Sequence, residues 1–198
     1  MRKAKAAPAR QAGGKLRIIG GQWRGRHLPF PAVPGLRPTG DRVRETLFNW
    51  LMPYLPGARC LDLFAGSGAL GLEALSRGAA HVDFVDSSDA VSRMLREQVA
   101  VLGSADRAEI HRSDALTWLG SATGTYDIVF LDPPFSAGLL GDCSTALVDA
   151  GVLSPGALVY REYPSGESPA LPAGWSEHRG KRAGDVFFQL LRTDADDG

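Results

Sequence analysis

Residues 60–71 read Cys60-Leu61-Asp62-Leu63-Phe64-Ala65-Gly66-Ser67-Gly68-Ala69-Leu70-Gly71. This stretch decides the fold, because an apolar run that breaks into glycines and continues as a helix is typical of a nucleotide-cofactor loop between a strand and a helix. Glycine lets the backbone approach a ligand closely, and the first helical turn presents N–H groups that lack partners within the helix. The helix is predicted to end near Gly78, since glycine commonly follows the last turn.

Two cofactors are compatible with this loop. Gly66, Gly68 and Gly71 satisfy the G-x-G-x-x-G pattern of NAD-binding proteins, and Asp86 follows Gly66 by twenty residues at the end of a second apolar run. A carboxylate at that point can accept hydrogen bonds from the ribose diol of either cofactor. Asp62 favours S-adenosylmethionine, because a carboxylate just before the glycines repels a pyrophosphate and attracts an ammonium and a sulfonium. We therefore expect S-adenosylmethionine as the cofactor, with contacts from Asp62, Phe64, Ala65, Gly66, Ser67, Gly68 and Asp86.

Apolar runs recur about every twenty residues and alternate with helical patterns, which predicts βαβ units and a mostly parallel sheet. The expected strands are 60–64, 82–85, 108–111, 126–131 and 157–160, with helices after residue 89, around 116–119 and within 140–150. The last apolar run, 186–191, is expected to be an antiparallel edge strand. Ligands of such sheets bind beyond the carboxyl ends of the strands. Gly66, Asp86, Asp114 and Asp132 each follow a strand, so one crevice can hold them together.

Asp114 lies directly after the third strand, in Ser113-Asp114-Ala115. It is placed to accept a hydrogen bond from the adenine amino group of the cofactor. The local sequence is also consistent with an N-cap for the helix that contains Leu116 and Leu119. Both interpretations stay open on local grounds.

The fourth strand runs into Asp132-Pro133-Pro134-Phe135. The two prolines lack N–H donors and have a fixed φ, which makes a stiff turn whose carbonyls point outward. An exocyclic amine on a nucleobase is a poor nucleophile that has to be held and aimed, and Asp132 and the carbonyl of Pro133 are candidate acceptors for it. Phe135 offers a face on which a flipped base can stack. Alone, the motif also fits a strand that ends in a Pro-Pro turn. With the glycine loop, it predicts methylation of an amino group on a planar ring.

The formal net charge of zero hides an uneven distribution. Residues 1–44 carry eleven Lys or Arg and one acid, whereas residues 45–198 carry eleven basic and twenty-one acidic residues. An acidic body suits a cationic cofactor, and a basic arm suits phosphates. We expect a disordered basic tail over 1–15, a basic RNA-binding hairpin over 16–36, a methyltransferase domain over 37–192 and an acidic tail over 193–198.

Basic residues interleave with glycines and Trp23 in the expected hairpin. An RNA backbone and an unstacked base bind such surfaces, although a solvated arm without a partner also explains the charge. The following helix is predicted to begin at Thr39 or Asp41, either of which can cap it, and arginines on its first turns can be surface residues of a structural helix or contacts to substrate. The candidate RNA contacts are Arg17, Trp23, Arg24, Arg26, Arg37, Arg42 and Arg44.

Length and composition fit one domain. With 198 residues, 44% of them hydrophobic, the chain can bury one full core. The apolar runs are shorter than the roughly eighteen residues that a membrane span needs, and the polar segment after Met1 lacks the apolar core of a signal peptide. Cys60 and Cys143 indicate neither a metal pair nor a disulfide scaffold, which fits a reducing cytoplasm. We expect no metal.

A family resemblance covers about residues 16–192 and rests on Arg17-Ile18-Ile19-Gly20-Gly21-Gln22-Trp23-Arg24-Gly25-Arg26, Gly35-Leu36-Arg37-Pro38-Thr39, Asp41-Arg42-Val43-Arg44-Glu45-Thr46-Leu47-Phe48-Asn49-Trp50, the glycine loop and Asp132-Pro133-Pro134-Phe135. These motifs resemble those of the RsmD-type bacterial 16S rRNA guanine-N2 methyltransferases. The resemblance implies an α/β fold of class I S-adenosylmethionine-dependent methyltransferases, Rossmann-like, with a seven-stranded mostly parallel sheet and an N-terminal β-hairpin extension.

The resemblance also implies a substrate and roles for single residues. The acceptor is one guanine of small-subunit ribosomal RNA, either in free 16S rRNA or in an assembling subunit. The glycine loop and Asp86 then hold the cofactor, Asp114 holds its adenine, and residues 132–135 hold the target base. The family commonly has Glu at the position of Asp86, so a shorter carboxylate must reach the ribose hydroxyls here.

Three alternative functions share parts of this pattern. A DNA adenine-N6 methyltransferase uses the same motif but usually needs a larger target-recognition region than residues 1–50 provide. A methyltransferase acting on a protein glutamine or a small molecule leaves the basic arm unexplained. A ribosome-assembly factor that binds RNA without turnover is disfavoured by the intact Asp132.

Overall fold

A computed structural model of the chain describes residues 13–31, 39–135 and 138–195. Most of the tail expected over 1–15, the candidate RNA contact Arg37 and the end of the acidic tail lie outside these residues. Within the described part, the first strand already begins at Gly14, inside the range expected to be disordered.

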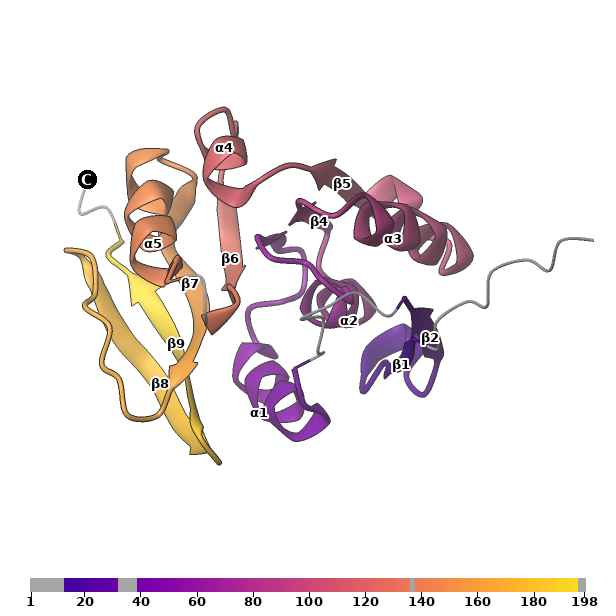
Figure 1. Cartoon of the computed structure of the whole chain (residues 1–198), viewed down its shortest axis with the longest axis horizontal. Helices are drawn as coiled ribbons and strands as arrows, with labels where there is room; N and C mark the ends of the chain where they lie inside the picture. The colour runs from indigo at the N-terminus through magenta and orange to yellow at the C-terminus, as the bar shows by residue number, and fades with distance from the viewer. Residues whose placement is uncertain (1–12, 32–38, 136–137, 196–198) are drawn as a thin grey trace, which may run out of the picture.

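Seven strands form the central sheet (Figure 1). In chain order they are β3 (Arg59–Asp62), β4 (His81–Asp86), β5 (Ala108–Arg112), β6 (Tyr126–Leu131), β7 (Leu153–Pro164), β8 (Trp175–Ala183) and β9 (Val186–Thr193). Their order across the sheet is β5-β4-β3-β6-β7-β9-β8, and β3 to β7 are parallel. The chain leaves β3 toward β4 on one side and returns to β6 on the other, so the strand order reverses between β3 and β6. In such sheets this reversal opens a crevice at the carboxyl ends of the strands.

The prediction for the last strand is wrong in one respect. β9 is antiparallel, as expected, but it lies between β7 and β8 and is not at the edge. The edge strand is β8, which the sequence analysis missed because its residues are mostly exposed and charged. Charged side chains are a common way to prevent an edge strand from pairing with other chains, and they also hide the hydrophobic alternation that predicts a strand.

Five helices cover the two faces of the sheet (Figure 1). One face packs against α1 (Asp41–Leu51), α2 (Ala69–Ser76) and α3 (Asp89–Val101), and the other against α4 (Ala115–Leu119) and α5 (Leu140–Asp149). The alternation of side chains along each strand separates two cores: Phe84 and Phe130 contribute to the first, Val85 and Leu131 to the second. None of the helices in the described residues is both long and apolar enough to cross a bilayer.

The N-terminal segment forms the expected hairpin. β1 (Gly14–Arg17) and β2 (His27–Phe30) pair antiparallel, and a short 3-10 helix, Gly21–Trp23, lies between them. Leu16, Ile18, Trp23 and Leu28 are buried in the same core as α1, α2 and α3. The hairpin therefore packs on the domain that contains the central sheet, beside α2 and α3 in Figure 1.

A buried carboxylate fastens the hairpin to α2. Glu73 is fully buried and accepts hydrogen bonds from the backbone N–H groups of Ile19 (2.8 Å) and Gly20 (2.7 Å). It also accepts one from Arg77 (2.7 Å), and the guanidinium of Arg44 lies 3.7 Å away. Because buried charges are costly unless they are paired, this arrangement fixes where the hairpin sits.

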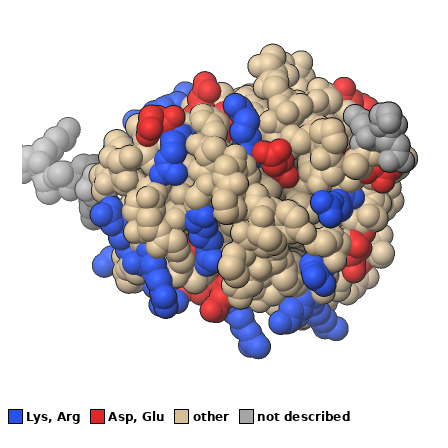
Figure 2. Space-filling view, turned by 180° about the vertical axis from the view of Figure 1, so that it is seen from behind, with Lys and Arg blue, Asp and Glu red and all other residues tan. Residues whose placement is uncertain are grey.

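Charge is unevenly spread over the surface. Lys and Arg side chains gather along the lower and left parts of the face in Figure 2, the left being the side on which the N-terminal hairpin lies. The lower edge is also where β6 and β7 end in Figure 1.

Candidate active site

The glycine loop between β3 and α2 has the conformation that its sequence predicts. Gly66 and Gly68 have φ values of 51° and 76°, which lie in the left-handed region that favours glycine. Gly71 has a different reason: a Cβ there would lie 2.2 Å from the ring of buried Phe84 on β4. The loop therefore needs two glycines for its turn and a third so that α2 can pack closely against the sheet.

Two acidic residues stabilise this loop. Asp62, at the end of β3, is buried and accepts a hydrogen bond from the backbone N–H of Gly71 (2.9 Å). Burial raises the pKa of Asp62 to about 7, with a further increase from the nearby Asp86 carboxylate. Asp86, at the end of β4, accepts from the N–H groups of Gly66 (3.0 Å) and Ser88 (2.8 Å). A carboxylate oxygen can accept more than one hydrogen bond, so Asp86 can support the loop and a ligand hydroxyl together.

Asp114 is an N-cap, one of the two interpretations left open by the sequence. One carboxylate oxygen accepts from the N–H groups of Leu116 (3.0 Å) and Thr117 (3.1 Å) at the start of α4. The residue is exposed, and among the described residues its other oxygen has no hydrogen-bond partner. Its contact with an adenine stays a prediction.

Asp132 follows β6 on the face of the sheet that α1 covers. Thr39 donates a hydrogen bond to it (3.4 Å). The expected cap by Thr39 is wrong, because the N-cap position of α1 is Gly40. On the neighbouring strand β7, Glu162 lies beside it and accepts a hydrogen bond from the hydroxyl of Tyr160. Burial raises the pKa of Asp132 well above its usual range, and the Glu162 and Asp62 carboxylates raise it further. Burial likewise raises the pKa of Glu162.

The three residues after Asp132 differ in exposure, and the ring at the end is exposed. Pro133 is buried, Pro134 is exposed, and the side chain of Phe135 is 48% exposed. An exposed phenyl ring next to a partly buried carboxylate is a suitable surface for stacking a planar base.

The crevice at the carboxyl ends of the strands gathers carboxyl groups that have no basic partner among the described residues. Asp62, Asp132 and Glu162 lie near one another, and among the described residues no Lys or Arg contributes to their pKa shifts. The raised pKa values show that these carboxylates are poorly compensated in the protein alone. A ligand with an ammonium and a sulfonium would relieve this repulsion, so the residues fit S-adenosylmethionine. The fold and this crevice define a class I S-adenosylmethionine-dependent methyltransferase.

Two of the residues predicted to contact RNA from the surface are buried in the structure. Trp23 is only 7% exposed because it is packed in the core, with the Arg107 guanidinium over its ring (5.7 Å). Arg44 is 1% exposed because it donates to the backbone carbonyls of Arg17 (3.0 Å) and Thr39 (3.1 Å) and pairs with Asp41 (2.6 Å). Asp41 thus pairs with arginine and does not cap α1.

The remaining predicted arginines in the described residues are exposed. Arg24 and Arg26 lie on the hairpin, and Arg42 lies on the first turn of α1. Arg17 is half-exposed and forms an ion pair with Asp41 (3.0 Å). These four arginines are not gathered around Asp132 by any contact among the described residues.

Sequence reasoning missed Glu73, Glu162 and Thr39. Glu73 is a single acid within an otherwise mostly apolar helix, and Glu162 is the only acid of a mostly apolar strand that also holds Arg161; that pattern could have identified both as buried charges with a structural or functional partner. Thr39 carries no comparable signal, because it is 93 residues away from Asp132 in the sequence and only the fold brings the two side chains together.

Comparison with known proteins agrees with this class. The family model described as Conserved hypothetical protein 95 matches residues 16–192. Ribosomal RNA small subunit methyltransferase D of Escherichia coli (strain K12) is 50% identical over 189 residues, which cover 95% of each protein. The protein of the same name from Haemophilus influenzae is 43% identical over 184 residues, covering 91% of this chain and 95% of that protein.

Solved structures give the same result. The structure of yhhF from Escherichia coli has a TM-score of 0.85 at 48% identity and covers 92% of this chain and 100% of that chain. HI0767 from Haemophilus influenzae has a TM-score of 0.81 at 39% identity, covering 91% and 99%. The chain belongs to the family of ribosomal RNA small subunit methyltransferase D. It is an enzyme, and its methyl donor is S-adenosylmethionine.

Proposed function

We propose that the protein methylates the exocyclic N2 of one guanine in the 16S rRNA of the small ribosomal subunit. The observation that carries this proposal is the partly buried Asp132, whose pKa is raised by desolvation, beside the exposed ring of Phe135 at the carboxyl edge of the sheet. Relatives that are 50% and 43% identical bear the name ribosomal RNA small subunit methyltransferase D, which supports the choice of substrate. The same proposal places the protein in the bacterial cytoplasm, where small subunits assemble.

Cofactor binding is assigned to the acidic crevice. S-adenosylmethionine supplies a methyl group on a sulfonium, which is a good leaving group. Phe64, Ala65, Gly66, Ser67 and Gly68 form the loop that lets the cofactor approach the backbone, Asp62 faces its positive charge, Asp86 accepts from the ribose hydroxyls and Asp114 accepts from the adenine. The protein contributes position and electrostatics, and no metal is required for this chemistry.

Asp132 is assigned to the amine of the target base. Its carboxylate and the carbonyl of Pro133 accept from the two N–H groups of the amine and so aim the nitrogen lone pair at the methyl group. Positive charge develops on this nitrogen during transfer, and a poorly compensated carboxylate stabilises it. Because its pKa is raised, Asp132 can also accept the proton that the methylated nitrogen releases.

The target base and the RNA backbone are held by different residues. Phe135, with Pro134 beside it, provides the exposed apolar surface for the base outside its stack. Arg24 and Arg26 on the hairpin contact phosphates, since both are exposed and the hairpin is fastened to the domain by Glu73.

Transfer of a labelled methyl group tests this proposal. Small subunits purified from cells that lack this gene should accept one methyl group per particle from labelled S-adenosylmethionine. Asp132→Ala should bind the cofactor normally in calorimetry but lose more than about tenfold in transfer, or more than about 1.4 kcal/mol in barrier height. Transfer by Asp132→Ala within tenfold of the wild type would remove Asp132 from this role.

A further inference from the structure

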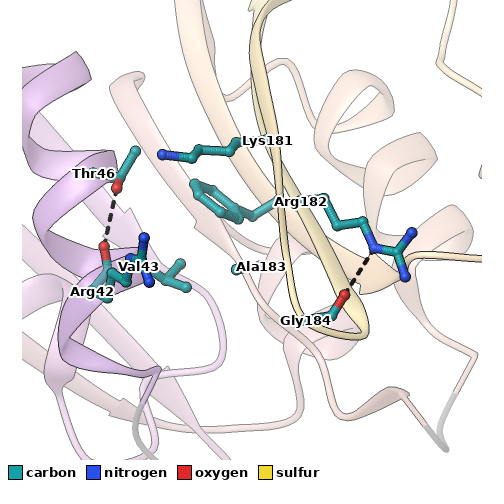
Figure 3. Close-up of a pocket in the computed structure, with 8 residues that line it drawn as sticks. Arg42, Val43, Thr46, Lys181, Arg182, Ala183 and Gly184 are labelled. Atoms are coloured by element: carbon teal, nitrogen blue, oxygen red, sulfur yellow. Dashed lines mark hydrogen bonds between the residues drawn. The ribbon is translucent and has the colours of Figure 1, made fainter.

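We propose that a pocket between α1 and the β8–β9 hairpin binds a backbone phosphate of the RNA next to the target guanine. This basic pocket has a volume of about 360 Å³ and is lined by Arg42, Val43, Thr46, Lys181, Arg182, Ala183, Gly184 and Phe188 (Figure 3). The inference rests on the proposed function, because it assigns a subsite for the same substrate.

Three cations line the pocket, and two of them, Arg42 and Lys181, belong to different elements and are proposed to hold the phosphate. Arg42 lies on the first turn of α1, and Lys181 extends from β8 toward α1 (Figure 3). Lys181 is paired with Phe188 across β8 and β9, so both side chains lie on the face that α1 covers. Arg182 is paired with Phe187 and therefore lies on the opposite face. In Figure 3 its guanidinium points away from α1, and it donates to the carbonyl of Gly184 (2.9 Å).

The two cations have no acidic partner in the part of the chain that the structure describes. Arg17, Arg44 and Arg77, by contrast, each pair with a carboxylate within 3.0 Å. The ion pairs of these three arginines account for their positions as structural residues. Two cations without a carboxylate partner on the walls of one cavity repel each other, and a bound anion would stabilise them. The cavity is larger than one phosphate group needs and leaves room for an adjoining ribose.

The basic pocket lies beside the residues assigned to the target base. Thr39, which donates to Asp132, precedes α1 by two residues, so the start of α1 joins Asp132 to Arg42. On the other side, Phe188 in the pocket wall is paired with Glu162, the carboxylate next to Asp132. The pocket and the target-base site therefore share one face and one edge of the sheet, and a phosphate bound there belongs to a nucleotide near the target.

The test compares the cations on the pocket walls with a cation of the same strand that does not line the pocket. Lys181→Gln and Arg42→Gln should each raise the KM for small subunits about tenfold, the size expected for one lost charged contact, while kcat and cofactor affinity stay within about twofold. Arg179→Gln removes one exposed positive charge from the same strand, β8, at a residue that does not line the pocket, and its KM should stay within about twofold of the wild type. Lys181→Arg should restore most of the affinity.

Salt dependence shows whether both cations hold the same phosphate. Each lost phosphate contact lowers the slope of log K against log salt by about 0.7 to 0.9. If both cations hold one phosphate, the slope for the double variant of Lys181 and Arg42 should fall by the amount expected for one lost phosphate contact and not by the amount for two. Thermal melting of every variant controls for folding, which these exposed residues should not affect.

The outcomes separate this inference from the proposed function. Wild-type transfer to small subunits, with Lys181→Gln and Arg42→Gln indistinguishable from the wild type, overturns the basic pocket and leaves the function standing. Equal losses for Lys181→Gln and Arg179→Gln also overturn it, because the effect would then be general electrostatic attraction by the positive charge of β8. No transfer by the wild type overturns the function, and the subsite with it.

Discussion

Glu73→Gln tests whether one buried carboxylate holds the basic hairpin on the enzyme. The substitution keeps the size of the side chain, so it creates no cavity. An amide retains one acceptor oxygen, but its NH₂ group then faces the backbone N–H of Ile19 or Gly20, and that donor is left without a partner. The guanidiniums of Arg77 (2.7 Å) and Arg44 (3.7 Å) also lose their counter-charge.

The expected loss of stability in Glu73→Gln follows from these contacts. A buried donor without a partner costs about 1–3 kcal/mol, and breaking a buried ion pair costs about 3–5 kcal/mol. Arg44 keeps its contact with Asp41 (2.6 Å), which limits the second cost. We expect a decrease of about 3–5 kcal/mol in the free energy of unfolding, which corresponds to roughly 10 °C in Tm for a domain of this size.

Denaturant unfolding and amide hydrogen exchange measure this effect. The matched control is Glu97→Gln on α3, where the glutamate is exposed and the change should stay within about 0.5 kcal/mol. Exchange at the amides of Ile19 and Gly20 should speed up in Glu73→Gln and not in the control. If both variants unfold within about 1 kcal/mol of each other, the carboxylate of Glu73 is not what fastens the hairpin.

Three further predictions concern the cofactor and the RNA. Asp86→Ala should weaken S-adenosylmethionine binding by about 1–3 kcal/mol in calorimetry, the worth of a hydrogen bond to a charged group, and an unchanged Kd would limit Asp86 to supporting the loop. Because folding raises the pKa of Asp62 to about 7, the free protein should lose stability as pH rises from the usual carboxyl range to about 7. Cofactor affinity should fall as pH drops through 7. Asp62→Asn should weaken both trends in melting and calorimetry, and the part that remains comes from Asp132 and Glu162, whose pKa values are also raised. Neutralising Arg24 and Arg26 together should lower the RNA salt slope by about 0.7 to 0.9 per lost contact, and a wild-type slope would exclude them as phosphate contacts.

The sheet, the glycine loop and the position of Asp132 could be predicted because their signals are local. Gly66 and Gly68 are needed for backbone conformations, and Asp132 follows a strand whose apolar pattern is clear. The hairpin could be predicted for the same reason. β8 could not, because an exposed edge strand lacks the hydrophobic alternation that identifies a strand.

Surface position could not be predicted from residue type. Trp23 and Arg44 look like RNA contacts by composition, but the fold buries both. Arg44 is stabilised by carbonyls of Arg17 and Thr39 that the sequence gives no reason to bring together. The pairing of Lys181 with Phe188, which turns one charge of β8 toward α1, likewise depends on a strand register that is visible only in three dimensions.

The methylated atom is the most direct test of the proposed function. Small subunits lacking the modification would be incubated with S-adenosylmethionine carrying a ¹³C-labelled deuterated methyl group, and the RNA would be digested to nucleosides for mass spectrometry. We predict that all of the label is found in N2-methylguanosine and that Asp132→Ala gives at least about tenfold less of it. Label at another position of guanine, on adenine or on a ribose would contradict the assignment of Asp132 and Phe135 to a guanine N2.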